Sequence, residues 1–226
     1  MHVLIVYYSF TGQAKRAADA TDAVVRAAGH DVTALRLEVA DPDARLTRPL
    51  AWAQITAWGR KASAGETVPV LLDPPSAARG DYDLVLLFTN TWSFSPSVPI
   101  QSFLKSQDGR RLLGGKPVAI YVICRGFWRS NLAKTTALVE AAGGRVIGGE
   151  AFVHPGAWLT STIQTVRHMM STTDQRRWGV LPLPAFGLSE ASMSRLEPFT
   201  LRALDAAAGG SAQADPSGFD RVRTKN

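Results

Sequence analysis

The chain has 226 residues, 46% of them hydrophobic and 19% charged, which supplies a sizeable core and excludes wholesale disorder. Its formal net charge of +6 comes from scattered basic residues rather than from a Lys/Arg-rich run, so no nucleic-acid partner is expected. A single cysteine excludes an intrachain disulfide framework, and no stretch approaches the roughly 18 apolar residues of a membrane span.

The chain opens on a predicted buried strand, Val3–Tyr7, because this run is apolar throughout. The strand begins without the features of a signal peptide, and with the lone cysteine this predicts a cytoplasmic protein. An Ala-rich helix is expected over Gln13–Ala28. The turn between them, Ser9-Phe10-Thr11-Gly12, offers two hydroxyl groups and the N–H groups of a helix N-terminus, where the helix dipole favours an anion. It is either a phosphate site or an ordinary connection built from capping residues.

Further strands are predicted at four places: Val32–Leu37, Leu84–Phe88, Val118–Ile123 and Val146–Phe152. Between the later strands, helices are expected at Val98–Lys105 and Asn131–Ala142. Such alternation implies right-handed crossovers and an α/β fold with a doubly wound, five-stranded parallel sheet. A phosphate turn after the first strand favours the strand order 2-1-3-4-5 over a dinucleotide-binding order.

Motifs of other nucleotide-binding folds and of metal sites are missing. No Gly-x-Gly-x-x-Gly follows the first strand, and no Gly-x-x-x-x-Gly-Lys-Ser/Thr occurs. We interpret Gly143-Gly144 and Gly148-Gly149 as turns flanking the last strand. No histidine or carboxylate pair shows metal-ligand spacing, so no metal is expected.

Two segments exceed a minimal domain of this class. An insertion of about residues 41–75 follows the second strand, and a helical C-terminal extension covers about 154–208. In the extension, helices are expected at Ala157–Met170 and at Glu190–Ala207 with Ser189 as N-cap. Residues 1–208 then form one domain, and the Gly/Ser-rich residues 209–226 form a disordered tail. Four of the six tryptophans lie in the two added segments, which predicts either a lid over an apolar substrate or a homodimer interface.

Aromatic and hydroxyl residues gather in the loops after the third and fourth strands, at Thr89–Ser97 and Cys124–Asn131. Because the carboxyl ends of parallel strands meet at one edge of the sheet, both loops should converge on the first turn. A flat, electron-poor ring needs aromatic stacking and a few backbone donors rather than charged catalysts. The rings in these loops either contact such a ligand or merely cover the sheet edge: Trp92, Phe94, Phe127 and Trp128.

The opening strand and turn resemble those of the flavodoxin family, whose phosphate loop reads Ser/Thr-x-Thr-Gly-Asn/Thr-Thr/Ser. The family's residues are kept at Ser9, Thr11 and Gly12, whereas Gln13 is a replacement and Ala14 lacks the final hydroxyl. The resemblance covers about residues 1–152 without the insertion. It extends to the family's aromatic turn, which Thr91 and Trp92 match. In the family's third flavin loop, only Gly126 matches.

This resemblance implies an oxidoreductase that passes electrons from NAD(P)H through FMN to a small apolar, aromatic or quinone-like substrate. The residues implied for the phosphate turn are Ser9, Phe10, Thr11, Gly12 and Gln13. Those implied around the flavin ring are Thr91, Trp92, Phe94, Gly126 and Phe127.

Two other functions stay open. The opening Val-Tyr-Tyr-Ser-x-Thr-Gly-Gln and the Trp/Pro-containing insertion are also similar to a flavodoxin-like group of dialkylresorcinol condensing enzymes. That similarity leaves a flavin-free role in aromatic polyketide or dialkylresorcinol synthesis as an alternative. An electron-transfer flavodoxin is disfavoured by the basic charge and the added aromatic segments.

Three further residues have side chains with catalytic chemistry. Cys124 is either a nucleophile whose pKa Arg125 lowers or, in the commoner role, a small buried side chain. His154 follows the last strand at the ligand-binding edge of the sheet, whereas His168 falls within a helix. The sequence assigns no catalytic acid or base among them.

Overall fold

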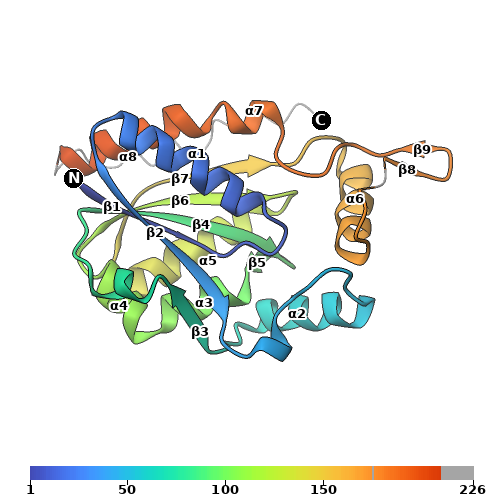
Figure 1. The fold of residues 1–226 in the computed structure, drawn as a ribbon, viewed down its shortest axis with the longest axis horizontal. Coiled ribbons are helices and arrows are strands. Elements are labelled where there is room, and N and C mark those ends of the chain that lie inside the picture. Colours follow the sequence, from blue (N-terminus) through green and yellow to red (C-terminus); the bar gives the residue numbers. More distant parts are fainter. Residues whose placement is uncertain (175, 210–226) are drawn as a thin grey trace.

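The computed structural model describes residues 1–174 and 176–209 (Figure 1). The main sheet has the order β3-β2-β1-β4-β6-β7, and a short β5 pairs with β4. Five neighbouring strands run parallel in the order β2-β1-β4-β6-β7, which confirms the expected order 2-1-3-4-5. The strands are β1 (His2–Tyr7), β2 (Asp31–Val39), β3 (Val70–Asp73), β4 (Leu84–Trp92), β5 (Ser95–Pro96), β6 (Pro117–Cys124) and β7 (Arg145–Val153).

Helices cover both faces of the sheet and its carboxyl edge (Figure 1). One face carries α1 (Gln13–Ala27), α7 (Glu190–Met193) and α8 (Leu196–Ala208). The other carries α3 (Val98–Lys105), α4 (Gln107–Leu113) and α5 (Trp128–Ala141). Beyond the carboxyl ends of the central strands lie α2 (Trp52–Ala64) and α6 (Trp158–Met170). The shorter elements are 3-10 turns at Pro42–Ala44 and Pro75–Arg79 and the hairpin β8 (Arg177–Trp178) and β9 (Leu181–Pro182). No helix within the described ranges is long and apolar enough to cross a bilayer.

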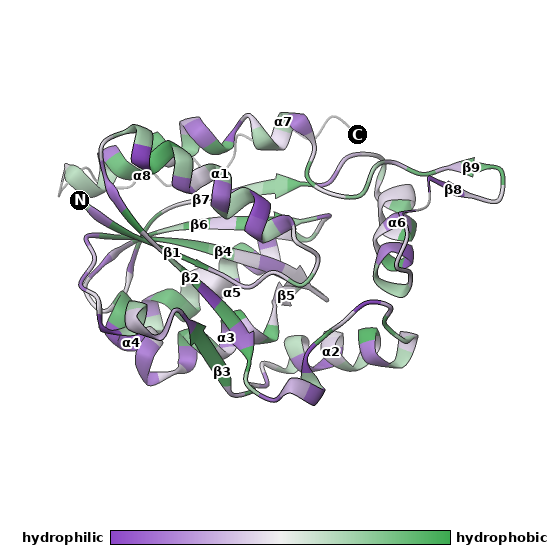
Figure 2. Ribbon diagram, viewed as in Figure 1, coloured by the Kyte–Doolittle hydropathy of each residue, from purple (hydrophilic) through white to green (hydrophobic). Residues whose placement is uncertain are grey.

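Strand β1 shows why an unbroken apolar run signals a central strand. Its alternate residues point to opposite faces, so Leu4 packs in one hydrophobic cluster and Ile5 in the other. Both side chains are fully buried. Figure 2 shows the same hydrophobic colouring along the central strands, as expected for a sheet covered on both faces.

The insertion contributes a strand that the sequence analysis did not predict. Val70–Asp73 pairs antiparallel with β2, so the expected five-stranded parallel sheet gains an antiparallel edge strand. This strand is short, and Pro74 follows it at once. Since proline has no N–H to donate to a ladder, pairing stops there and the edge stays short.

The interpretation of Gly148-Gly149 as a turn is wrong. Both residues lie inside β7 and pair with β6. A Cβ atom on Gly149 would come 2.5 Å from the Leu132 side chain of α5, so glycine here lets the helix approach the sheet closely. The turn before β7 is made by Gly143, whose φ is +87°.

The single helix expected over Glu190–Ala207 is in fact two helices, α7 and α8. Ser189 caps α7 as predicted, because its hydroxyl oxygen accepts the N–H of Ser192 at 3.1 Å. In a continuous helix, Pro198 would remove one hydrogen bond and its ring would clash with the carbonyl four residues earlier. The chain therefore interrupts the helix at Ser194 and begins α8 just before the proline. Apart from Gly209, which ends α8, the tail expected over 209–226 lies outside the described residues.

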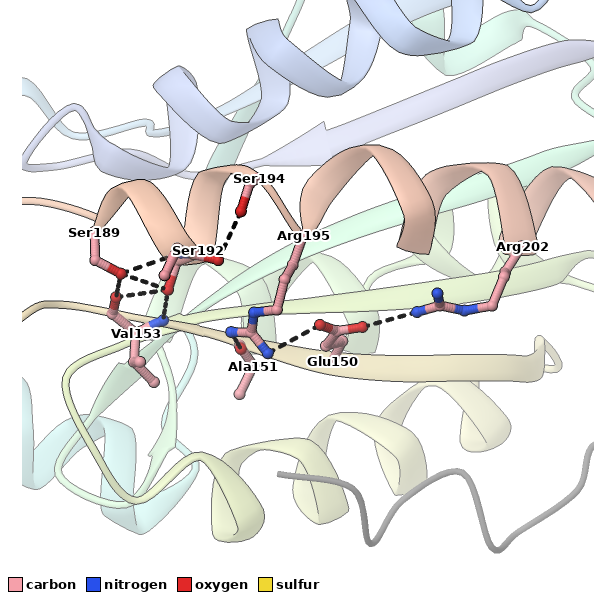
Figure 3. Close-up of polar contacts among 9 residues, drawn as sticks. Glu150, Ala151, Val153, Ser189, Ser192, Ser194, Arg195 and Arg202 are labelled. Atoms are coloured by element: carbon pink, nitrogen blue, oxygen red, sulfur yellow. Dashed lines mark hydrogen bonds and ion pairs between the residues drawn. The ribbon is translucent and has the colours of Figure 1, made fainter. Parts of the chain in front are cut away.

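Side chains of the extension bond to the outer edge of β7 (Figure 3). Ser192 accepts the backbone N–H of Val153 at 3.0 Å and donates to the carbonyl of the same residue at 2.9 Å. Arg195 donates to the carbonyl of Ala151 at 2.7 Å. Since β7 is the last strand of the sheet, these side chains pair backbone groups that no further strand pairs.

A carboxylate between two arginines adds to this attachment (Figure 3). Arg195 and Arg202 each donate to one oxygen of Glu150 at 3.0 Å. The Arg195 guanidinium also lies 5.5 Å above the ring of Phe152. The extension is thus fixed to the sheet by hydrogen bonds as well as by its apolar packing.

Candidate functional site

A cavity of about 360 Å³ opens at the carboxyl ends of β1, β4 and β6. It lies where the strand order reverses, because β2 extends the sheet to one side of β1 and β4 extends it to the other. The turn before α1 and the loops after β4 and β6 form one side, and α2 and α6 form the other. Several aromatic residues line it: Tyr8, Phe10, Trp52, Trp58, Trp92, Phe94, Phe127 and Phe186.

The structure brings together most of the residues that the flavodoxin resemblance implies. Those lining the cavity are Phe10, Thr11, Gln13, Thr91, Trp92, Phe94, Gly126 and Phe127. Ser9 and Gly12 are absent from the lining. The Ser9 hydroxyl oxygen instead accepts the backbone N–H of Lys15 at 3.1 Å, which is the capping role weighed as the alternative for this turn.

The turn before α1 leaves part of the helix N-terminus available. Gly12 precedes the helix with φ +81°, and a Cβ atom there would meet nothing within 4 Å. Glycine has no side chain that could cap the helix, and no acidic residue stands in the first turn. Within the described chain the N–H groups of Gln13 and Ala14 therefore have no side-chain acceptor, which suits an anion at this end of the dipole.

Gln13 connects this turn to the C-terminal extension. Its Oε1 accepts the backbone N–H of Leu188 at 3.0 Å. Gly187, with φ +117°, approaches so closely that a Cβ atom there would lie 2.8 Å from the same oxygen. Nothing in the local sequence signals this contact, because its partners are 175 residues apart.

The loop after β4 is a strained hairpin. Trp92 pairs with Ser95, and the two residues between them, Ser93 and Phe94, have φ values of +44° and +68°. Positive φ at both central positions is the geometry of a type I′ turn, which usually selects Asn-Gly. Phe127, in the loop after β6, also has positive φ, at +55°. Strain of this kind in non-glycine residues concentrates at ligand sites.

The insertion reaches the cavity through tryptophan contacts. Trp92 packs edge-on against Trp58 of α2 at 5.7 Å and against Tyr8 at 5.8 Å between ring centroids. Two tryptophans of the added segments, Trp52 and Trp58, line the cavity. The other two, Trp158 and Trp178, do not line it and are more than half exposed.

The insertion and the extension are joined beside the cavity. The backbone N–H of Leu50 donates to the carbonyl of Met169 at 2.8 Å, and the Arg48 guanidinium contacts the ring of His168. That ring stacks on Phe186, with 3.5 Å between centroids and 7° between planes. His168 itself does not line the cavity, in agreement with its expected place within a helix, so its contacts hold the two segments together.

Besides Tyr8, which follows β1, the ionisable groups of the cavity lie at the ends of β6 and β7. Burial raises the pKa of the Cys124 thiol to about 12, so the side chain is a protonated, buried thiol at neutral pH rather than a nucleophile. Burial, with the nearby Arg125 charge, lowers the pKa of His154 to about 4. His154 is therefore a neutral imidazole at neutral pH. Its ring packs edge-on against Phe186 at 5.1 Å. The part of the chain that the structure describes holds no cluster of three or more His, Cys, Asp or Glu side chains suited to a metal ion.

Comparisons with known proteins give structural neighbours only. No family model and no curated protein matches the sequence. A flavoprotein in complex with FMN from Lactobacillus acidophilus is similar over 66% of this chain and 92% of its own, with a TM-score of 0.53 and 19% identity. A flavodoxin from the domain Archaea is similar over 92% and 99%, with a TM-score of 0.49 and 9% identity. A flavodoxin, WrbA-like protein from Agrobacterium tumefaciens is similar over 93% of this chain and 99% of its own, with a TM-score of 0.46 and 14% identity.

Proposed function

From the flavodoxin-like fold of this chain, we propose that the cavity binds FMN and that the protein is an oxidoreductase acting on a small aromatic or quinone-like molecule with NAD(P)H as electron donor. One observation carries the proposal: two aromatic loops and a helix N-terminus, whose Gln13 and Ala14 N–H groups have no side-chain acceptor within the described chain, converge on a single cavity. The fold shared with an FMN-bound flavoprotein supports it.

The residues of the cavity fit this cofactor. The N–H groups of Gln13 and Ala14 and the Thr11 hydroxyl would hold the phosphate. The rings of Trp92 and Phe94, with Phe127 from the facing loop, would flank the flavin, because all three line the cavity. When bound, FMN supplies the group that accepts and returns a hydride.

An orphaned polar atom gives an independent test of the fit. The buried side-chain oxygen of Asn90, which lines the cavity, has no hydrogen-bond partner within the described chain. Buried acceptors are nearly always paired, so this oxygen calls for a donor from a ligand. A flavin carries an N–H on the edge of its ring, and Asn90 lies near the carboxyl end of β4, beside the proposed ring site.

In this scheme the protein itself orients the bound ring, excludes water from it and places a proton near the substrate. The aromatic walls shield a bound ring from solvent and strengthen polar contacts to it. His154, neutral at neutral pH, offers an imidazole N–H to an oxygen of the substrate. Cys124 stays protonated and takes no covalent part in this scheme.

The added segments support a small-molecule substrate over electron transfer to a protein partner. Helices α2 and α6 line the side of the cavity opposite the strand ends. They narrow the approach to a bound ring, whereas exchange with a partner's redox centre needs an exposed ring edge. Two roles were predicted for the tryptophans of the added segments, a lid over the substrate and a homodimer interface. The position of Trp52 and Trp58 in the cavity lining supports the lid.

The test begins with a fluorescence and absorbance titration of the purified protein with FMN, with riboflavin as the control that lacks the phosphate. We expect saturable quenching and tighter binding of FMN than of riboflavin. Absence of saturable binding overturns the proposal and favours the flavin-free biosynthetic role. If FMN binds, oxidation of NADH and NADPH is followed under anaerobic conditions with a quinone series, and no turnover removes the enzymatic part.

A further inference from the structure

The cavity contains a positive charge for which residues 1–174 and 176–209 provide no counter-charge. Arg125 lines it, and no Asp or Glu of the described residues does. Within the same residues the Arg125 side chain forms no ion pair, and its buried Nε has no hydrogen-bond partner. With His154 neutral at neutral pH, Arg125 gives the cavity a net charge of +1.

Such a charge is unfavourable without a partner. Burial lowers the pKa of Arg125, which reflects the water that the guanidinium has lost. Arg195, which is also partly buried, donates to Glu150 at 3.0 Å, whereas the buried Nε of Arg167 in α6 is, like that of Arg125, without a partner among the described residues. A partly buried ion without a partner loses hydration that an opposite charge can offset in part, so the cavity favours a ligand that brings a negative charge.

The phosphate of FMN and the charge of Arg125 belong to different parts of the cavity edge. The proposed phosphate turn follows β1, whereas Arg125 follows β6, and β4 lies between these strands. Two strand spacings separate the two backbone positions by about 10 Å. A second negative group on the β6 side would therefore lie closer to the guanidinium than a phosphate seated on α1.

The residues around Arg125 indicate what kind of anionic ligand would fit beside it. Next in the chain come Gly126 and the strained Phe127, and the neighbouring strand end presents His154 against Phe186. The site thus combines a planar guanidinium, which matches a carboxylate with two parallel hydrogen bonds, with flat apolar walls.

We propose that the substrate of this cavity is an aromatic molecule carrying an ionised acid, and that Arg125 binds the acid while the aromatic side chains bind the ring. The inference rests on the proposed function, which it extends from aromatic molecules in general to aromatic acids.

A matched pair of probes tests the inference: 2-naphthoate and its uncharged amide, 2-naphthamide. Their affinities are measured calorimetrically for the FMN-loaded protein and for the protein without flavin. The variants are Arg125→Gln, which removes the charge, and Arg125→Lys, which keeps it. Arg129→Gln is the matched control, because Arg129 is exposed and absent from the cavity lining. Far-UV circular dichroism establishes that each variant is folded.

We expect the protein to bind 2-naphthoate at least about tenfold more tightly than the amide, the size of a charge-assisted bidentate contact. Arg125→Gln should abolish this preference, Arg125→Lys should retain part of it, and Arg129→Gln should leave it unchanged. Equal affinities for the two probes, or an undiminished preference in Arg125→Gln, overturn the inference.

Flavin binding is measured in parallel so that the two proposals fail separately. A protein that binds FMN but does not distinguish the probes loses only the inference about the substrate. A protein that distinguishes the probes but never binds FMN loses the proposed flavin function. If Arg125→Gln instead weakens FMN binding about tenfold and leaves the probes unaffected, the charge serves the cofactor and the inference is overturned.

Discussion

The ring of Phe94 lies 4.1 Å from that of Phe127 between centroids, although both residues hold positive φ angles that side chains disfavour. The two rings are half exposed at the edge of the cavity, so burial in a core does not explain them. The strained backbone holds both rings at the edge of the cavity, where a ligand can pack against them.

Phe94→Gly should therefore separate binding from stability. Glycine relieves roughly 1 kcal/mol of backbone strain, while loss of the ring pair costs about the same, so unfolding free energy should change by less than about 1 kcal/mol. FMN affinity should fall about tenfold because one wall of the ring site is lost. Urea unfolding and flavin fluorescence measure the two quantities. Trp178→Ala, at an exposed tryptophan outside the cavity, should leave FMN affinity unchanged.

Gln13→Glu should weaken FMN binding through charge alone. The substitution keeps the oxygen that accepts the N–H of Leu188, so the thermal midpoint should move by only a few degrees. A carboxylate beside the proposed phosphate position should lower FMN affinity by about tenfold or more, while riboflavin affinity stays within about twofold. An equal loss for both flavins would show that the phosphate lies elsewhere.

His154 should make stability depend on pH between 7 and 5. In the unfolded chain its pKa is near the ordinary value of 6.5, and in the folded protein burial lowers the pKa to about 4. Over this window the unfolded state binds a proton that the folded state excludes, so stability falls as the pH drops and levels off below pH 4. Between pH 7 and pH 5, His154 should contribute a loss of about 2 kcal/mol.

The variant His154→Gln checks this directly, by urea unfolding at both pH values. It should lose less stability than the parent over the same interval, because no proton is excluded at this position. The pKa of His168 is also lowered, by burial first, but that residue is present in both proteins and cancels in the comparison. Parallel losses in parent and variant would contradict the assignment.

The two arginines at Glu150 should differ in their contribution to stability. Arg195 donates to both Glu150 and the carbonyl of Ala151, and its side chain is 36% exposed, so Arg195→Ala should cost about 2 kcal/mol. Arg202 is 63% exposed and contacts only the carboxylate among these groups, so Arg202→Ala should cost less than about 1 kcal/mol. Thermal unfolding of the pair measures the difference, and equal costs would show that the Ala151 contact contributes little.

The sheet could be predicted from the sequence because burial on both faces makes each central strand a continuous apolar run. The helix expected over Val98–Lys105 has the observed bounds. By contrast, β4 runs four residues beyond its expected end at Phe88. Its polar residues 89–91 are typical of a loop in sequence, but they pair with β6 and β5. Strand propensity is estimated from the side chains, whereas the hydrogen bonds that pair two strands are made by the backbone.

Part of the candidate site could also be predicted, since strand order alone determines which loops meet. The hairpin at Ser93 and Phe94 could not, because these residues lack the Asn-Gly signature of its turn. The contact from Gln13 to Leu188 was equally hidden, because it joins segments far apart in the chain. A lid over the substrate, by contrast, was one of the two roles predicted for the added segments, which include α2. The isolated charge of Arg125 becomes visible only when every side chain around it is known.

The position of α8 has a consequence for synthesis. Phe199 and Leu204 of this helix pack in the same hydrophobic cluster as Val3 and Ala17 from the beginning of the chain. One half of the core therefore stays open to water until residues 196–208 have left the ribosome. A nascent chain that ends before α8 exposes the apolar face of β7 and α1, and the cavity forms beside a sheet whose strands are all present but one of whose faces is only partly covered.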